Sequence, residues 1–379
     1  MIRHWTINGR FLTQPVTGVQ RYGREVVQAL DRQMAQGHPL ARDLEIELVA
    51  PPDIFDPLPL TAIRTHIVGG AGGHAWEQAV LAGRARGGTI SLTNTGPLLA
   101  RKHIVCIHDV NTRAFPASYS RPFRMLYRAL MPALGRSAIR VATVSHYSAD
   151  QLVAHGICKA EKLLVAPNGH EHALQWTPAH TEVTCAAAGR DTIVLLGSQA
   201  PHKNVGLVLS IAGRLAEAGL RIALAGHADP HVFQSAGIAR ADNVQALGRL
   251  PDAALAALLQ DSLCLAFPSF VEGFGLPPLE AMALGCPVVV SDRASLPEIC
   301  GDSALYASPT DPEAWLDSFL RLRNEDALRA GLVARGRARA ADFSWSTTAQ
   351  LYLRAMAVAD GLPVEDEAPA DAPAAYLAM

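Results

Sequence analysis

Short apolar runs alternate along the chain with longer segments whose apolar residues recur at helical spacing. In the first half, the apolar runs predict strands at residues 2–7, 46–50, 63–68, 89–92, 104–107, 141–144 and 163–166. Helical patterns lie between them, at residues 19–36, from 74, at 119–140 and from 146. Because short strands separated by helices form parallel sheets with crossover connections, this half predicts a doubly wound α/β domain.

The pattern lapses between residues 170 and 191, where the chain is polar and rich in small residues, as is typical of a linker. It then restarts, with strands predicted at residues 193–196, 221–225, 244–247, 263–267, 288–291 and 304–306. Helices are predicted at residues 203–218, 252–260, around 280, and at 312–323, 325–341 and 346–359. The sequence therefore predicts two domains, at residues 1–172 and 190–345, and a mobile tail at 361–379 that is rich in Ala, Pro, Asp and Glu.

Composition agrees with an ordered protein of two domains, since 379 residues exceed a usual single core and 49% of them are hydrophobic. The net charge of -2 argues against nucleic acid as the main partner. The six cysteines form no C-x-x-C pair, so we expect neither a zinc site nor disulfides, and reduced thiols in the cytoplasm fit best. No signal peptide and no apolar run of about 20 residues is visible, which predicts a soluble or peripherally membrane-associated protein.

The segment at residues 119–140 interleaves five arginines with apolar side chains. We favour an amphipathic helix of the first domain with a solvated basic face. The alternative is a helix that lies on anionic lipid headgroups.

Glu272 and Glu280 frame the segment E-G-F-G-L-P-P-L-E, which leads from an apolar strand through a glycine-bearing loop into a proline-started helix. This order places residues 273–276 at a helix N-terminus, where backbone N–H groups and the helix dipole favour an anion. Carboxylates accept hydrogen bonds from sugar hydroxyls, although Glu280 in a first helical turn would also complement the dipole. An anion joined to a polyol suggests a nucleotide sugar.

Lys203 follows the strand at 193–196, in G-S-Q-A-P-H-K-N, at the predicted start of a helix. Its flexible ammonium could reach a diphosphate there. The alternative is an exposed lysine in a first turn, but a cation at that end opposes the helix dipole, so we favour a functional role.

Three further candidates lie in the first domain. His108 and Asp109 end an apolar strand, at the strand end where such folds place working groups. Gly18 lies in the first strand-to-helix loop and would allow close approach of a ligand. No G-x-G-x-x-G follows the first strand, which disfavours an oxidoreductase. Ligands of parallel sheets bind outside the carboxyl ends of the strands, so we expect a site in a cleft between two facing domains.

The segment E-G-F-G-L-P-P-L-E-A-M-A-L-G-C-P-V resembles the donor-binding signature of family-4 glycosyltransferases of the GT-B architecture. Further similar pieces are T-G-V-Q-R-Y, I-H-D-V, T-V-S-H-Y-S, A-P-N-G and G-S-Q-A-P-H-K-N. The resemblance implies two facing Rossmann-like domains, with a helix at residues 346–360 that crosses back to the first domain. It also implies a transferase that retains anomeric configuration and needs no cofactor and no metal ion.

The resemblance also implies roles for single residues. Lys203, with Asn204 beside it, would contact the donor diphosphate, and Glu280 would bind the nucleotide ribose. The donor sugar and its phosphate would be held by Glu272 and by the amides of Gly273, Phe274, Gly275 and Leu276. His108 would lie beside the reacting sugar, with Gly18 and Asp109 on the acceptor or phosphate side. The catalytic candidates are therefore His108, Lys203 and Glu272.

Two positions depart from the family pattern. His202 stands before Lys203 where many members carry arginine, and the usual P-N-G-V-D is P-N-G-H-E, with His170 and Glu171.

The sequence as a whole resembles those of bacterial mannosyl- or rhamnosyltransferases of surface polysaccharide synthesis. This resemblance makes GDP-mannose the first choice of donor and a UDP- or dTDP-sugar the alternative. A glycan or lipid-linked glycan would be the acceptor, with peripheral contact at the cytoplasmic face of the inner membrane. A sugar-nucleotide-binding protein without turnover, a phosphorylase or an epimerase are the alternatives of a different class.

Overall fold

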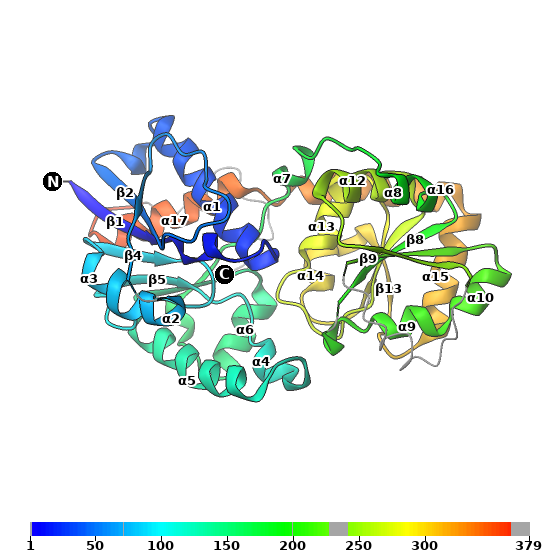
Figure 1. Cartoon of the computed structure of the whole chain (residues 1–379), viewed down its shortest axis with the longest axis horizontal. Coiled ribbons are helices and arrows are strands. Elements are labelled where there is room, and N and C mark those ends of the chain that lie inside the picture. Colours follow the sequence, from blue (N-terminus) through cyan, green and yellow to red (C-terminus); the bar gives the residue numbers. More distant parts are fainter. Residues whose placement is uncertain (1, 71, 199, 227–241, 365–379) are drawn as a thin grey trace. The chain divides into compact units, whose positions relative to one another are not determined.

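The computed structural model describes residues 2–70, 72–198, 200–226 and 242–364. The tail predicted at 361–379 lies mostly outside these residues. The chain forms two compact units (Figure 1). The first contains Met1–Arg113, Arg121–Gly169 and Phe343–Met379, and the second contains Ala114–Ser120 and His170–Asp342.

Each unit is built on a parallel sheet. The strands of the first are β1 (Arg3–Asn8), β2 (Leu44–Ala50), β3 (Arg64–Ile67), β4 (Gly88–Ser91), β5 (Lys102–Cys106), β6 (Arg140–Thr143) and β7 (Leu163–Val165). Those of the second are β8 (Thr192–Gly197), β9 (Arg221–Gly226), β10 (Val244–Gly248), β11 (Cys264–Phe267), β12 (Val288–Ser291) and β13 (Ala304–Ala307).

The longer helices of the first unit are α1 (Gly18–Ala35), α5 (Arg121–Ser137), α6 (His146–Ala154) and α17 (Trp345–Ala359). Short helices α2 (Gly73–Ala75), η3 (Trp76–Leu81), α3 (Ala82–Arg84) and α4 (Asn111–Ala114) lie between them in sequence, with 3-10 turns η1 (Gly9–Thr13), η2 (Pro39–Ala41) and η5 (Ala160–Lys162). Helices of the second unit are α7 (Glu171–Leu174), α8 (Glu182–Ala187), α9 (Val205–Ser210), α10 (Ala212–Glu217), α12 (Asp252–Asp261), α13 (Leu276–Ala283), α14 (Leu296–Cys300), α15 (Pro312–Asn324) and α16 (Asp326–Ala341). Its 3-10 turns are η4 (Pro116–Ser118), η6 (Pro201–Lys203) and η7 (Gly301–Ser303).

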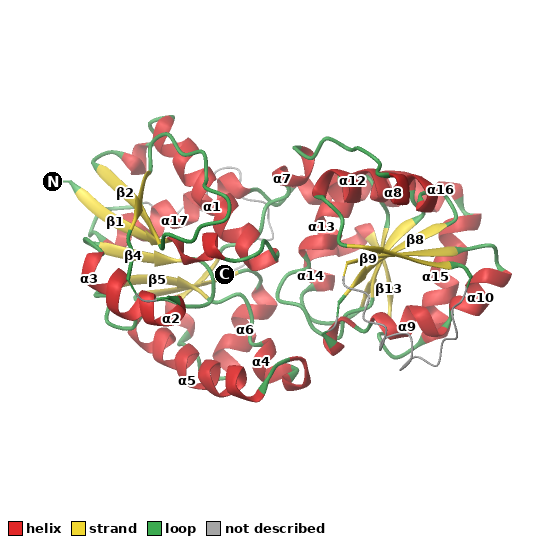
Figure 2. Ribbon diagram, viewed as in Figure 1, coloured by secondary structure: helices red, strands yellow, loops and turns green. Residues whose placement is uncertain are grey.

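Both sheets have a Rossmann strand order. The first sheet runs β3-β2-β1-β4-β5-β6-β7 and the second β10-β9-β8-β11-β12-β13, with every neighbouring pair parallel. In each sheet the order reverses beside the first strand, between β1 and β4 and between β8 and β11. Helices cover both faces of each sheet (Figure 2), for example α8 and α12 on one face of the second sheet and α9 and α10 on the other. The predicted pair of doubly wound Rossmann-like domains is confirmed.

The cores explain why these segments form these elements. Strands buried on both faces are nearly continuous apolar runs, as in Val288–Ser291, where every residue is buried. In the second unit, Trp315 and Phe319 of α15 pack with residues of β8, β9 and β11 in one apolar cluster. In the first unit, Tyr352 of α17 hydrogen-bonds Tyr22 of α1, with 3.0 Å between the two buried hydroxyl oxygens.

Two features differ from the sequence-based expectation. The segment predicted as a linker between residues 170 and 191 contains the helices α7 and α8. Residues Ala114–Ser120 belong to the second unit, although they lie within the range predicted for the first domain. None of the described helices is both long and apolar enough to cross a membrane.

Candidate active site

Lys203 and Glu272 lie where the strand order of the second sheet reverses. Lys203 ends η6, which follows β8, and Glu272 lies in the loop that follows β11. The loops after two strands that flank such a reversal diverge, which leaves a crevice at the carboxyl edge of the sheet where open α/β sheets bind ligands. Two of the predicted site residues therefore meet at the carboxyl edge of the second sheet.

The ammonium of Lys203 is held by both carboxylate oxygens of Glu272. Its Nζ donates to Oε1 at 2.7 Å and to Oε2 at 2.9 Å, and it lies 5.3 Å from the ring centroid of Phe267. The Lys203 side chain is 29% exposed and that of Glu272 is 10% exposed. The lysine is thus oriented but still accessible, and its charge is balanced by Glu272 rather than by a helix dipole.

The loop between Glu272 and α13 is held in a defined shape. Ser295 Oγ donates to the carbonyl oxygens of Glu272 at 3.1 Å and of Phe274 at 2.8 Å. Gly275, the N-cap of α13, has a φ of 107°, and a Cβ there would lie 2.8 Å from Cδ2 of Leu296. Only glycine suits this position, both because of its backbone conformation and because of the close contact.

The start of α13 offers few backbone donors of its own. The helix begins at Leu276, and Pro277 and Pro278, which follow, carry no N–H. An anion at this end would therefore rely on Leu276 and on the preceding loop, as the predicted set 273–276 requires. Glu280 is the fifth residue of the helix, so the expectation that it lies in the first turn was wrong.

Glu280 is positioned by a residue that the sequence did not reveal. Its Oε1 lies 2.9 Å from Nε2 of His172, and both side chains are buried. The His172 ring also makes an edge contact with Trp176, with 5.5 Å between the ring centroids. His172 belongs to α7, in the segment taken for a linker, where no hydrophobic period pointed to a structural role.

The resemblance noted in the sequence implies that Glu280 binds the ribose of a nucleotide donor. On that expectation, replacing His172 by alanine should raise the KM for the donor about three- to tenfold and leave kcat nearly unchanged. Without this hydrogen bond the Glu280 carboxylate can rotate, and ordering it again when the donor binds costs on the order of 1 kcal/mol of side-chain entropy. Initial rates at varied donor concentration test this, with His172→Gln expected to recover part of the loss. An unchanged KM in His172→Ala would contradict the positioning role.

Asn204 and His202 shape the chain on either side of Lys203. Asn204 has a left-handed φ of 53°, and its Nδ2 donates to the carbonyl oxygens of Pro268 at 3.1 Å and Pro309 at 2.8 Å. Its side chain therefore fixes the backbone near Lys203, and its predicted contact with the donor stays a prediction. His202 is buried, and its Nδ1 lies 2.8 Å from Oγ of Ser118.

His108, in the first unit, is a buried and neutral histidine. Its Nε2 lies 2.9 Å from the carbonyl oxygen of Leu92, so this nitrogen carries the proton and donates. Burial lowers the pKa of His108 to about 4. Nδ1 is then the acceptor nitrogen of the ring, which suits a hydrogen bond from a sugar hydroxyl and excludes a cationic role near pH 7.

The other predicted residues of the first unit have local roles in the backbone. Asp109 Oδ1 accepts from the backbone N–H of Asn111 at 2.8 Å, just after the strand end. Gly18 begins α1, with Thr17 as the N-cap residue. Their predicted place on the acceptor or phosphate side stays a prediction. In the described ranges, no group of three or more His, Cys, Asp or Glu is arranged to hold a metal ion.

Acidification is expected to destabilise the first unit between about pH 6.5 and pH 4. Burial lowers the pKa of both His103 and His108 to about 4, so the unfolded chain binds these protons at higher pH than the folded one. The stabilisation is complete above the unfolded pKa of about 6.5 and is lost as the pH falls, by up to about 1.4 kcal/mol per pH unit for each histidine.

Urea unfolding of the first unit at about pH 7, 6 and 5 measures this slope. The variant His103→Gln has no titratable group at that position, so its free energy of unfolding is expected to fall with pH about half as steeply as that of the wild type. A free energy of unfolding that stays constant from pH 7 to 5 would contradict the buried neutral state of both rings.

Residues 190–325 match the family model described as "Glycosyl transferases group 1". The second unit is a group 1 glycosyl transferase domain. The matched range includes β8, η6, the Glu272 loop and α13, and thus the part of the site that holds Lys203, Glu272 and Glu280.

The sequence is also similar to those of two mannosyltransferases. The "O-antigen chain mannosyltransferase B" of Escherichia coli is 45% identical over 102 residues, which is 27% of either chain. The "O-antigen chain mannosyltransferase RfbU" of Salmonella typhimurium is 26% identical over 59% of this chain and 61% of its own length. The chain thus spans between about a quarter and three-fifths of these relatives.

A solved structure shows the same fold over nearly the whole chain. The sucrose-phosphate synthase of Thermosynechococcus elongatus superposes with a TM-score of 0.69 at 18% identity, covering 94% of this chain and all of the other. At this identity the similarity concerns the fold, and it extends through both the group 1 glycosyl transferase domain and the first unit.

Proposed function

We propose that the chain is a retaining, metal-independent glycosyltransferase that moves a hexose, with mannose from GDP-mannose as first choice, to a glycan or lipid-linked glycan. The observation that supports this most is the Lys203–Glu272 pair at the strand-order reversal, with both carboxylate oxygens on the ammonium. A fixed, partly exposed cation beside a glycine-capped helix start suits a diphosphate that leaves with two negative charges.

In the proposed reaction, the acceptor hydroxyl attacks the anomeric carbon from the face that the nucleoside diphosphate leaves. The bond from the anomeric carbon to the phosphate oxygen breaks, and the hydroxyl proton passes to that oxygen. Lys203 and the amide of Leu276 stabilise the departing charge, and Glu280 binds the ribose hydroxyls. Glu272 holds the sugar and keeps Lys203 oriented.

The proposed donor follows from the relatives. Both relatives named above are mannosyltransferases of O-antigen chains by name, and one of them is 45% identical over its aligned residues. Surface polysaccharide synthesis is the corresponding process, and the site residues themselves do not distinguish the base of the nucleotide.

A thermal-shift panel of GDP-mannose, UDP-glucose, dTDP-rhamnose and ADP-glucose tests the donor. We expect GDP-mannose to raise the Tm most, because specific binding stabilises by RT ln(1 + [L]/Kd). Transfer to a glycan acceptor, measured with the favoured donor, should persist in EDTA, and NMR of the product should show the donor's anomeric configuration.

Other outcomes of the same assays would contradict parts of the proposal. Binding without transfer or hydrolysis would indicate a sugar-nucleotide-binding protein, and a requirement for phosphate would indicate a phosphorylase. Loss of transfer in EDTA that added metal restores would overturn metal independence, and an inverted product would overturn retention.

Helix α5 supports a peripheral membrane contact of this enzyme. Phe123, Met125 and Leu126 are 38%, 74% and 44% exposed on the same helix as exposed Arg121 and Arg128. Exposed apolar side chains beside arginines suit the headgroup region of an anionic bilayer, where a lipid-linked acceptor would also lie.

We expect the double variant Met125→Glu/Leu126→Glu to bind vesicles that contain phosphatidylglycerol about tenfold more weakly than the wild type. The change removes two apolar anchors and adds two negative charges. Co-sedimentation measures the effect, with Val153→Glu, at a residue of α6 that is 41% exposed, as the control. Equal binding by all three proteins would show that α5 is a solvated domain helix.

A further inference from the structure

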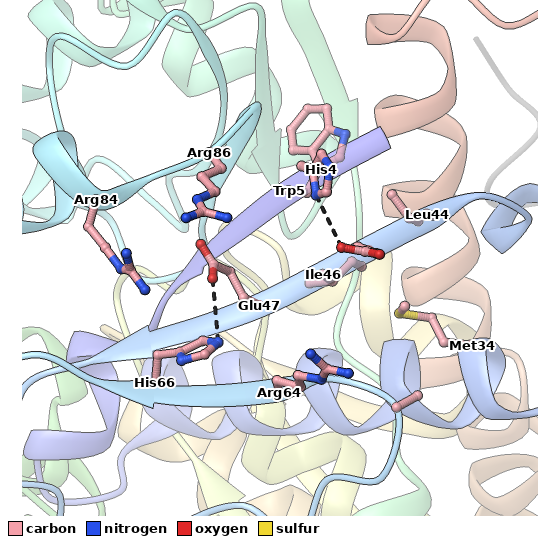
Figure 3. Close-up of a pocket in the computed structure, with 12 residues that line it drawn as sticks. His4, Trp5, Met34, Leu44, Ile46, Glu47, Arg64, His66, Arg84 and Arg86 are labelled. Carbon is pink, nitrogen blue, oxygen red and sulfur yellow. Dashed lines mark ion pairs between the residues drawn. The ribbon is translucent and has the colours of Figure 1, made fainter. Parts of the chain in front are cut away.

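A cavity of about 320 Å³ opens in the first unit at the amino-terminal part of its sheet. His4 is the second residue of β1, Glu45 the second of β2 and Arg64 the first of β3, and all three line the cavity. Figure 3 labels His4 and Arg64 among the side chains around it. In a parallel sheet the amino ends of the strands share one edge, which is opposite to the edge where His108 follows β5. The cavity is therefore separate from His108, the catalytic candidate of this unit.

Three guanidinium groups line this cavity without a protein partner. They belong to Arg64, to Arg84 at the end of α3, and to Arg86 just before β4. Within the described part of the chain, none of these three side chains makes a hydrogen bond or an ion pair. Positive charges gathered around one cavity repel each other unless an anion lies among them.

The carboxylates at the cavity already have partners. Glu45 Oε2 lies 3.3 Å from Nδ1 of His4 and Glu47 Oε2 lies 3.6 Å from Nε2 of His66. Glu47 Oε1 also accepts from the hydroxyl of Thr6 at 3.0 Å. In Figure 3, the arginines at residues 84 and 86 reach toward Glu47 from one side, but no ion pair joins them to it.

The arginines thus outnumber the acids, and the two acids face histidines, which add positive charge when protonated. The ionic side chains of the lining therefore have a net positive charge whether or not the histidines are charged.

The remaining lining is apolar. It includes Met34 of α1 and Leu44 and Ile46 of β2, the last two of which are buried. The volume lies at the lower end of the range of about 300–1,000 Å³ that small-molecule pockets occupy, well above the space that a bare phosphate fills. The combination suits a ligand with an anionic group and a compact body.

We propose that this cavity binds a phosphate monoester, with Arg64, Arg84 and Arg86 on the phosphate oxygens and the body of the ligand in the rest of the cavity, beside the half-buried Met34. A phosphate is favoured over a carboxylate because its dianion can engage several guanidinium forks at once. The same chemistry is presented by a free sugar phosphate and by the headgroup of an anionic lipid. The site does not depend on the proposed transferase reaction.

Calorimetric titration of the full chain with inorganic phosphate and with glucose 6-phosphate, at low ionic strength, tests this. The variant Arg84→Gln/Arg86→Gln removes two unpaired, exposed guanidinium groups, so the fold is expected to persist. We expect it to bind glucose 6-phosphate at least about tenfold more weakly than the wild type. The control Arg32→Gln/Arg101→Gln, which changes the net charge equally at two exposed positions of the same unit, should bind as the wild type does.

Lys203→Ala separates this cavity from the site in the second unit. Phosphate-ester binding that persists in Lys203→Ala and is lost in Arg84→Gln/Arg86→Gln supports the proposal. The proposal is overturned if phosphate-ester binding is lost only in Lys203→Ala, or if Arg84→Gln/Arg86→Gln binds the phosphate ester as tightly as the wild type does.

Binding to phosphatidic acid vesicles, measured in parallel, distinguishes a lipid headgroup from a free sugar phosphate as the ligand. If the wild type binds vesicles but not glucose 6-phosphate, and Arg84→Gln/Arg86→Gln reduces vesicle binding, the ligand is a lipid headgroup and the proposal stands. If the two arginine substitutions affect neither probe, the proposal fails.

Discussion

Replacing Lys203 by alanine is expected to lower kcat for hexose transfer about 10²–10³-fold, the effect of removing one preorganised electrostatic group from an active site. Its ammonium is fixed by Glu272 at 2.7 and 2.9 Å and lies at the strand-order reversal, where the leaving diphosphate is proposed to bind. Steady-state kinetics with GDP-mannose measures the loss. Lys159→Ala, at a lysine whose side chain is 80% exposed in the first unit, is the matched control and should keep full activity.

A second variant separates catalysis from folding. In Lys203→Ala, Glu272 becomes a carboxylate that is 10% exposed and lacks its ammonium partner, which could disturb the loop. The double variant Lys203→Ala/Glu272→Gln removes that unpaired charge and should regain Tm but not activity. If the double variant recovered transfer, the loss in Lys203→Ala would come from the loop and the electrostatic role would be wrong.

Replacing Glu280 by alanine is expected to lower kcat/KM for the donor about 10- to 100-fold, mainly through KM. A hydrogen bond to a charged group contributes about 1.5–3 kcal/mol, and the ribose hydroxyls would lose their acceptor. The carboxylate is buried and held 2.9 Å from His172, so its loss removes an oriented group. Initial rates at varied GDP-mannose concentration test this.

Two comparisons make the Glu280 result specific. Glu313→Ala removes an exposed glutamate of the same unit that pairs with Arg214, and it should leave the KM unchanged. Glu280→Gln keeps an acceptor oxygen but no charge, and it should fall between wild type and Glu280→Ala. A KM in Glu280→Ala equal to that of the wild type would remove Glu280 from the donor site.

The alternation of apolar runs and helical patterns was sufficient to predict the two parallel sheets. The predicted strand at 288–291 coincides with β12, because a strand buried on both faces is a short, uninterrupted apolar run. The predicted helix at 203–218 is divided at Ile211 into α9 and α10. Val208 and Leu215, on either side of the break, pack in the same cluster, so the hydrophobic pattern continues through a backbone irregularity that it cannot reveal.

Contacts between distant residues were beyond the reach of the local pattern. Lys203 and Glu272 could be assigned separately from strand ends and motif, but their ion pair joins residues 69 positions apart. His172 is 108 positions from Glu280 and lies in a segment without period, so only the folded chain shows it beside the carboxylate. The packing of Phe115 on Phe270, with 5.7 Å between the ring centroids, likewise follows from the return of residues 114–120 to the second unit.

The central claim is that Lys203 and Glu280 hold a sugar nucleotide at the strand-order reversal of the second sheet. Calorimetric titration of GDP-mannose into the wild type and into Lys203→Ala/Glu280→Ala tests it most directly. We expect specific binding by the wild type and binding at least about 100-fold weaker, a loss of about 2.7 kcal/mol, in the double variant with its fold intact. Equal affinity of the two proteins, or a wild type that binds none of the GDP-, UDP-, dTDP- and ADP-sugars, would contradict the account.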